Sequence, residues 1–308
     1  MTKAASNATP ASTASGGGLW TDALPAVFVV LWATGFIGSK LGAPYSEPFT
    51  FLGIRFAAAA VLMFLIIAAM RVALPVGRAA LMNAVIIGVL VHGTYLGGVF
   101  WAIDRGVSAG VAALIVGMQP LVTSLAAGPL LGERVTPRHW LGLVLGFTGV
   151  ALVVWNKIDL GAGDGWGFAA CAVSMLAISS GSLYQKKTGA AGDLRGQQAV
   201  QLTAAAIFVW MLSLAFENQV IEWTAEFIVA LVWLTAVMSL GTFTLLYVLI
   251  RRGAASKVSS LFYLVPPVAA LMAWAMFDET LAPQALIGMA IAVVGVALAS
   301  RGTAGKPS

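Results

Sequence analysis

Charge is scarce in this chain. Only 9% of the 308 residues are Asp, Glu, Lys or Arg, whereas 60% are hydrophobic. Soluble domains carry about 25% charged residues, so this composition excludes a soluble fold of this length. Apolar runs such as "AALMNAVIIGVLVHGTYLGGVFWAI" and "GVAALIVGMQPLVTSLAAGPLLG" reach the roughly 20 residues that cross a bilayer as a helix. They show no two-residue alternation, so the sequence predicts an all-α polytopic membrane protein rather than a barrel.

Several other features are absent. The single Cys171 excludes an intramolecular disulfide. The sequence contains neither a metal-ligand cluster nor a nucleotide-binding loop, so we expect no cofactor, no metal and no ATP-driven step. Residues 1–23 lack the basic start and apolar core of a signal peptide, and we expect them to form a disordered cytoplasmic tail, like residues 302–308. The expected partners are a small-molecule substrate and the lipid bilayer, and no nucleic acid.

Apolar runs and turn signals predict ten transmembrane helices. Their approximate bounds are 24–42, 49–70, 79–103, 107–130, 137–155, 166–186, 197–216, 226–250, 255–277 and 283–300. With cytoplasmic N- and C-termini, the inner segments hold 13 of the 17 Lys and Arg residues. The outer loops hold only Lys40, Arg105 and Lys157, and Arg55 lies within the second span. This asymmetry follows the positive-inside rule and predicts a multi-pass protein of the cell inner membrane.

The two halves of the sequence repeat each other at an offset of 146 residues. The matched pairs are Pro120 and Pro266, Glu133 and Glu279, Pro137 and Pro283, Gly142 and Gly288, and the "GVAL" of 149–152 and 295–298. With a one-residue gap upstream, "DRG" at 104–106 matches "RRG" at 251–253. Each copy, 24–156 and 165–301, holds five predicted spans. Because five is odd, the second copy must be inverted, and inverted-topology repeats are typical of alternating-access transporters.

The repeat also resembles a known family. "ERVTPRHWLGLVLGFTGVAL", its partner "ETLAPQALIGMAIAVVGVAL" and the Arg of "FLGIRFAAAAVL" are similar to the EamA-type repeat of the drug/metabolite transporter superfamily. The resemblance implies ten helices with inside termini and a central cavity lined by spans 1, 3, 4, 6, 8 and 9. It also implies that spans 5 and 10 pack together or form a homodimer. Known members export amino acids, including the aromatic amino-acid exporters of the YddG type, and others carry nucleotide sugars, phosphorylated sugars or further metabolites.

Prolines near the middle of two predicted spans are candidate hinges. Pro120 lies in the fourth span and the Pro266–Pro267 pair in the ninth. A proline inside a helix removes one backbone hydrogen bond and clashes with the preceding turn. The symmetric placement favours helix breaks that bind solute or let the halves move, and the alternative is a packed structural kink.

Aromatic and polar residues at helical spacing predict a pocket. The candidate substrate-binding residues are Trp32, Phe36, His92, Tyr95, Gln119, Tyr184, Phe243, Tyr247, Ser260 and Tyr263. Polar groups in a bilayer should face the bundle interior, although each one alone could equally be an interhelical contact. Together they suit a small, partly apolar solute with a polar head.

Three charged residues are assigned structural roles. Arg55 is expected to anchor a carboxylate or loop carbonyls, and Glu133 and Glu279 to cap helices or border the gates. No Asp or Glu lies in the middle of a predicted span, and proton-driven antiporters usually need a buried carboxylate. We therefore expect facilitated export of small metabolites, with amino acids, including aromatic ones, as the leading substrate class. Weak coupling through His92, the only histidine in a span, is the alternative, and a core histidine is the simpler interpretation.

Other functions fit the sequence less well. "GVSAG" at 106–110 matches the G-x-S-x-G motif of serine hydrolases, but that motif requires a strand–turn–helix context. We therefore predict that the protein is not an enzyme. Nothing resembles a selectivity filter, which disfavours a channel. Carriers of sugar-phosphates, nucleotide sugars or drug-like cations remain alternatives to an amino-acid exporter.

Overall fold

The computed structural model describes residues 19–131, 136–159, 164–188, 193–242, 245, 261–279 and 282–300. In these ranges every regular element is helical, and the only β interaction is an isolated bridge between Ser46 and Ile221. The all-helical prediction is thus confirmed for the described part of the chain. The elements are α1 (Leu19–Gly42), η1 (Ala43–Tyr45), α2 (Pro48–Met70), α3 (Arg78–Ile87), η2 (Gly88–Thr94), α4 (Tyr95–Asp104), α5 (Ala109–Val116), α6 (Gln119–Leu131), α7 (Pro137–Asp159), α8 (Gly165–Thr188), α9 (Leu194–Phe216), α10 (Ala225–Val232), η3 (Trp233–Thr242), η4 (Phe262–Leu264), α13 (Val265–Phe277) and α14 (Pro283–Ser300).

Five described helices are long and apolar enough to cross a bilayer. They comprise Ala23–Tyr45, Pro48–Met70, Arg78–Asp104, Gly165–Thr188 and Leu194–Phe216, and shorter apolar helices accompany them at Ala109–Thr123, Trp140–Val153, Ala225–Ser239, Val265–Phe277 and Pro283–Leu298. The chain is therefore a multi-pass membrane protein. Helix α1 begins at Leu19, before the predicted start at 24, and α7 continues to Asp159 rather than 155. The number of spans and the side on which the termini lie stay predictions.

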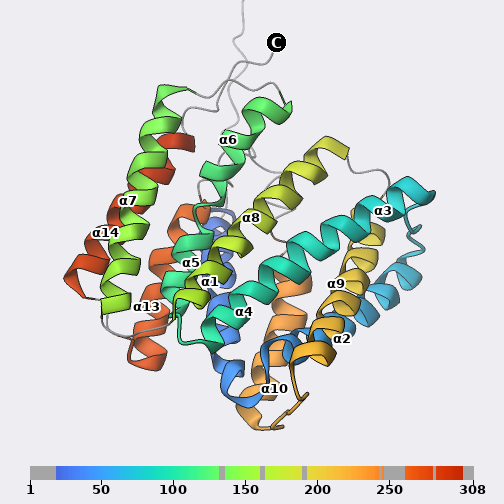
Figure 1. Ribbon diagram of the computed structural model, residues 1–308. Coiled ribbons are helices and arrows are strands. Elements are labelled where there is room, and N and C mark those ends of the chain that lie inside the picture. Colours follow the sequence, from blue (N-terminus) through green and yellow to red (C-terminus); the bar gives the residue numbers. More distant parts are fainter. Residues whose placement is uncertain are drawn as a thin grey trace, which may run out of the picture.

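The helices form one bundle with two outer pairs (Figure 1). Helices α7 and α14 cross at one edge, and α2 packs against α9 at the other. Between them lie α1, α4, α5, α8 and α13, which share one buried cluster that includes Phe28, Phe36, Tyr95 and Ala269. A second buried cluster joins α2 and α9 to α10 around Phe51, Phe56 and Phe227. Many hydrophobic side chains on the outer faces of the helices are exposed, as expected for surfaces that contact lipid.

Glycines allow the close crossing of α7 and α14. A Cβ at Gly149 would lie 2.4 Å from the carbonyl oxygen of Gly288, and a Cβ at Gly295 would lie 2.7 Å from that of Gly142. Only glycine fits at such distances from a backbone. Since Gly142 and Gly149 match Gly288 and Gly295 at the offset of 146, the two contacts are reciprocal.

Two helices contain π segments. Between α3 and α4 the helix continues through η2, and α10 continues through η3. A π turn accommodates an extra residue and changes the direction in which the following side chains point, and such turns are frequent at functional sites. Segment η2 carries His92 and directly precedes Tyr95, whereas the buried polar residues of η3 are Thr235, Ser239 and Thr242.

Loops tie the helices together at one end of the bundle, here called the tied end. The Glu217 carboxylate accepts hydrogen bonds from the backbone N–H groups of Phe49 and Thr50, 2.7 Å each, at the start of α2. Glu47 accepts a 2.8 Å bond from the N–H of Asn218 in return. These carboxylates satisfy free N–H groups at the N-terminus of α2 and after α9, and so fix the helix pair at this end.

Candidate substrate site

The helix that carries Pro120 is broken. Helix α5 ends at Val116, residues 117–118 form a turn, and Pro120 is the second residue of α6. At the matching place, the 3₁₀ turn η4 precedes α13, and Pro266 is the second residue of that helix, followed by Pro267. Proline suits the first turn of a helix, where its missing N–H has no partner to lose. Both breaks therefore lie at the predicted prolines, and their role as hinges stays a prediction.

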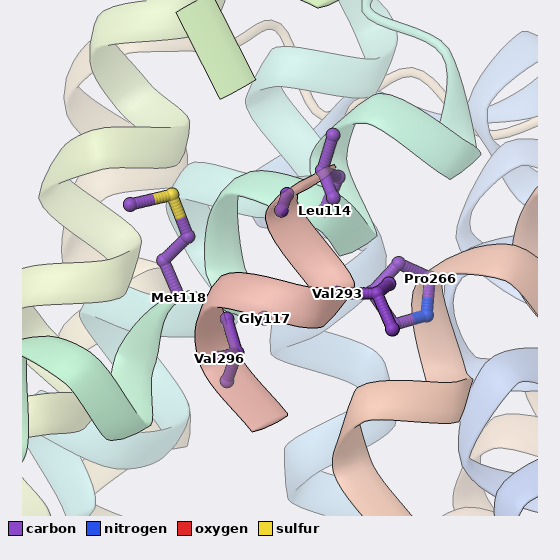
Figure 2. Close-up of a pocket in the computed structure, with 7 residues that line it drawn as sticks. Leu114, Gly117, Met118, Pro266, Val293 and Val296 are labelled. Atoms are coloured by element: carbon purple, nitrogen blue, oxygen red, sulfur yellow. The ribbon is translucent and has the colours of Figure 1, made fainter. Parts of the chain in front are cut away.

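The two breaks meet in space. A Cβ at Gly117 would lie 3.0 Å from Cγ of Pro266. Figure 2 shows the small pocket at this junction, with side chains from the first break, from Pro266 and from α14. Its lining residues are Leu114, Gly117, Met118, Pro266, Ala292, Val293 and Val296. The lining is apolar and offers no partner for a charged head group. The pocket leaves free volume beside the breaks, and it is a poor place for a zwitterion.

The aromatic candidates gather around α1. The Trp32 ring lies 4.8 Å from Phe262 and 5.5 Å from Phe28, measured between ring centroids, and the contact with Phe262 is edge-to-face. Trp32 is only partly buried, whereas Phe36 and Tyr95 lie in the same buried cluster. Phe28, Trp32 and Phe262 form an aromatic wall between α1 and η4, and Phe36 and Tyr95 belong to the buried cluster that contains Phe28.

The polar candidates form a second group between α2, α9 and the helix that contains η2. The His92 side chain is hydrogen-bonded to Gln201, and Arg55 lies near both His92 and Tyr95. The His92 ring also stacks edge-on against Phe56 at 6.1 Å. Tyr95 lies near Arg55 in this polar cluster and also belongs to the buried apolar cluster that contains Phe28 of the aromatic wall.

Gln119 and Tyr184 make contacts with other helices. The Gln119 amide nitrogen lies 3.2 Å from the Ser182 hydroxyl, and the Tyr184 hydroxyl donates a 2.7 Å hydrogen bond to the side-chain Oδ1 of Asn83. The structure thus places Trp32, Phe36 and Tyr95 in one apolar cluster, with His92 one turn before Tyr95. Gln119 of α6 contacts α8, and Tyr184 lies on α8. Of the other candidates, Phe243, Tyr247, Ser260 and Glu133 lie outside the described residues, as does the side chain of Tyr263.

Glu279 makes an ion pair. Its carboxylate accepts a hydrogen bond from Lys40 at the end of α1. The Lys40 ammonium also lies 5.0 Å from the centroid of the Phe277 ring. The pair closes the gap between α1 and the end of α13 at the tied end of the bundle.

Ser108, the serine of "GVSAG", caps a helix. It is the N-cap of α5, and its side-chain oxygen accepts a 3.4 Å bond from the Val111 N–H. The following Gly110 packs against Ala270 of α13, where a Cβ would approach to 3.0 Å. The motif therefore begins a helix and allows close packing. Among the described residues, no group of three or more His, Cys, Asp or Glu could hold a metal ion.

Sequence reasoning missed several partners. Phe262 belongs to the aromatic wall, and Asn83 binds Tyr184, yet neither was among the candidates. Phe262 could have been found from the sequence, because it lies next to the candidate Tyr263 and four residues before Pro266. Gln201, which stands 146 residues after Arg55, was not among the candidates either. Its contact with His92 depends on the packing of two helices that are distant in the sequence.

The bundle and its interrupted helices define a polytopic membrane protein of the transporter class. The sequence profile of the EamA-like transporter family matches the chain twice, over residues 19–155 and 165–301. The chain therefore belongs to the EamA-like transporter family, within the drug/metabolite transporter superfamily.

Three relatives span almost the whole chain. The uncharacterized transporter YvbV of Bacillus subtilis is 29% identical over 290 residues, which cover 90% of both chains. The uncharacterized inner membrane transporter YedA of Escherichia coli K12 is 26% identical and covers 89% of this chain and 88% of its own. The probable amino-acid metabolite efflux pump of the same organism is 22% identical and covers 89% and 92%. One solved crystal structure, 20% identical with a TM-score of 0.63, covers 90% of this chain and 95% of its own and shares the fold.

Proposed function

We propose that this protein is a secondary transporter that exports amino acids, including aromatic ones, across the cell inner membrane by alternating access. In this proposal ten spans form two inverted five-helix repeats with cytoplasmic termini, and the tied end faces outward. Transport is facilitated, and a homodimer is compatible with the lipid-facing surface. The YddG-type exporters are the subgroup whose substrates agree best with the aromatic wall.

The observation that carries the proposal is the matched placement of the helix interruptions. The turn at 117–118 and Pro120 correspond, at the offset of 146, to residues 263–264 and Pro266. With the one-residue gap upstream, η2 corresponds to residues 235–241 within η3. Interrupted helices in corresponding positions of two halves are typical of transporters whose site lies at the repeat interface. The reciprocal glycine contacts of α7 and α14 support the same symmetry.

The ion pair at the tied end supports a gate. Lys40 and Glu279 join α1 to the end of α13, and breaking the pair would free these helices to separate. At the offset of 146, Lys40 matches Lys186 and Glu279 matches Glu133. The sequence therefore carries both charges in each half, as expected if the two ends open in turn. Glu133 lies outside the described residues.

The environment of the site supports the substrate class. An aromatic wall suits an apolar side chain, and the polar cluster beside it suits a charged head group. The relative named a probable amino-acid metabolite efflux pump agrees with this choice. The described Asp and Glu side chains lie at helix ends or in loops, which supports transport down the solute gradient rather than proton antiport.

The experiment is flux into proteoliposomes that contain the full chain. Labelled phenylalanine, leucine, threonine, a sugar-phosphate and a drug-like cation are offered in turn, with protein-free vesicles as the control. We expect saturable uptake and countertransport of amino acids without any pH gradient. Flux of the sugar-phosphate alone would overturn the substrate, and flux that never saturates would indicate a channel. Accumulation under a pH gradient that His92→Ala abolishes would replace facilitated transport by proton coupling.

A further inference from the structure

Arg55 is a buried cation without a described counterion. Its side chain is buried, and only 5% of the residue is exposed. Its Nε has no hydrogen-bond partner, and among the described residues no carboxylate forms an ion pair with the guanidinium. The sequence predicted a structural anchor that binds a carboxylate or loop carbonyls, and neither contact is found in the described part of the chain.

The groups that face Arg55 are neutral or aromatic. The Phe56 ring centroid lies 5.6 Å from its Cζ, and the Tyr95 side chain is a near neighbour. His92 also lies near Arg55, and its side chain is hydrogen-bonded to Gln201 on α9. The cluster therefore offers the guanidinium of Arg55, the imidazole of His92, the hydroxyl of Tyr95 and the amide of Gln201. These groups come from α2, η2, α4 and α9.

A buried guanidinium without a counterion is costly in this place. Arginine stays protonated inside proteins, and a buried charge is retained only where another group compensates it. Intramembrane ionisable residues accordingly mark ligand sites and ion pathways. The planar fork of arginine matches a carboxylate with two parallel hydrogen bonds. The missing partner is therefore expected to be an anionic group that arrives with a ligand.

Segment η2 gives this cluster a means of opening. It is a π segment directly before Tyr95, and it packs against α9 at Gly88, where a Cβ would lie 2.4 Å from the Gln201 carbonyl oxygen. His92 and Tyr95 thus sit at and beside an irregular turn rather than on a regular helix. A shift of this turn would move both side chains relative to Arg55.

We propose that Arg55 binds the carboxylate of the transported solute, with His92, Tyr95 and Gln201 as neighbouring hydrogen-bonding groups. This proposal rests on the proposed function for the identity of the solute as an amino acid. It adds that the carboxylate, rather than the amino group, is recognised in the first half of the molecule. The Tyr95 ring then directs the solute side chain toward the aromatic wall.

Binding is tested separately from transport. The purified full chain in detergent is titrated with phenylalanine, phenylacetate and phenethylamine, and its thermal unfolding is followed. We expect phenylalanine and phenylacetate to raise the midpoint and phenethylamine to leave it unchanged. The variant Arg55→Gln should lose about tenfold or more in affinity for both carboxylates, since hydrogen bonds to charged groups contribute about 1.5–3 kcal/mol. Arg55→Lys keeps the charge without the planar fork of the guanidinium. Its affinity for the carboxylates should lie between that of the wild type and that of Arg55→Gln.

A matched variant distinguishes recognition from a structural role. Arg78→Gln removes the same charge at the exposed start of α3 and should bind as the wild type does. If Arg55→Gln unfolds, Arg55→Lys still reports the preference for a carboxylate over an amine. Equal affinity of the wild type for phenylacetate and phenethylamine would overturn the proposal, as would a folded Arg55→Gln variant, or a folded Arg55→Lys variant, whose affinity for phenylacetate equals that of the wild type.

The outcome also separates this proposal from the proposed function. Arg55-dependent binding of phenylacetate, combined with no amino-acid flux in liposomes, would retain the carboxylate site and reject the amino acid as the solute. Amino-acid flux that Arg55→Gln and Arg55→Lys leave unchanged would retain the function and reject the site.

Discussion

The two halves of the molecule share their architecture but not their chemistry. Both contain a π segment, a broken helix with a proline in the first turn after the break, and a pair of glycines at the α7–α14 crossing. The first half places Arg55, His92 and Tyr95 in the interior. The second half has Gln201 at the offset of 146 from Arg55, and Ser239 and Thr242 at the offset of 147 from His92 and Tyr95. Repetition therefore fixes how the helices pack, and single residues in one half supply the charge and the titratable groups.

The hydrogen bonds show the same contrast. In η3 the Ser239 and Thr242 hydroxyls donate to the Leu234 and Val237 carbonyls of their own helix. Such bonds satisfy backbone acceptors that a π segment leaves in altered geometry. His92 in η2 instead pairs with a side chain on another helix. The Ser239 and Thr242 hydroxyls thus bond within their own helix, whereas His92 contacts a side chain of α9.

The largest loss of stability is expected at the α7–α14 crossing, where the two halves contribute matching glycines. Gly149→Val and Gly288→Val each place side-chain atoms against the backbone of the opposite helix, and we expect each to destabilise the bundle by about 1–3 kcal/mol or more. The measurement is the thermal unfolding midpoint in detergent. Gly165→Ala, which has open space around its Cβ, is the control. A large loss for one glycine and none for its partner would contradict the reciprocal crossing.

The second comparison concerns the chemistry that the halves do not share. His92→Asn should reduce amino-acid flux about tenfold, because it disturbs a pair whose buried groups cost about 1–3 kcal/mol when left unmatched. Ser239→Ala removes one bond within a helix, worth about 1 kcal/mol of stability, and should leave flux within about twofold of the wild type. Proteoliposome flux and unfolding midpoints are measured for both. Equal flux losses would place the chemistry in both halves.

A smaller effect is expected at the Lys40–Glu279 ion pair. Both side chains are partly exposed, so Lys40→Gln should change the free energy of unfolding by less than about 1 kcal/mol. It should nevertheless increase the labelling of a cysteine placed at the C-terminal end of α1. The reversed pair, with Lys40→Glu and Glu279→Lys combined, should restore the labelling of the wild type. Unchanged labelling in all variants would reject a gate at this end.

The smallest effect belongs to the exposed pair of Arg105 and Asp164, 2.7 Å apart. The Gly167 backbone N–H and then Arg105 lower the pKa of the Asp164 carboxyl below its usual value of 3.8. The carboxylate therefore contributes stability above about pH 4, and this contribution is lost as the pH falls through the lowered pKa. Asp164→Asn should flatten this part of the pH profile of unfolding slightly. Arg105→Gln, which leaves the Gly167 bond intact, should flatten it less, and the opposite order would contradict the assignment.

The sequence predicts the helices better than their contacts. Apolar runs locate α2, α9 and α14 because burial in a bilayer demands long apolar helices, and Pro120 and Pro266 locate the breaks because proline cannot continue the hydrogen-bond ladder. Neither π segment is predicted, since a π turn changes no composition. The pairing of His92 with Gln201 and of Trp32 with Phe262 depends on how helices far apart in the sequence align. The grouping of Arg55, His92 and Tyr95 emerges only from that packing.

Alternating access is the central claim, and distances between spin labels test it most directly. Cys171 is replaced by alanine, and cysteine pairs are placed at exposed positions, Pro44 with Met276 at the tied end and Arg138 with Lys187 at the opposite end, which the proposal assigns to the cytoplasm. Double electron–electron resonance is recorded with and without Glu279→Gln. We predict that this substitution lengthens the distance between Pro44 and Met276 and shortens the distance between Arg138 and Lys187. Distances that both lengthen, or that both stay unchanged, would contradict the account.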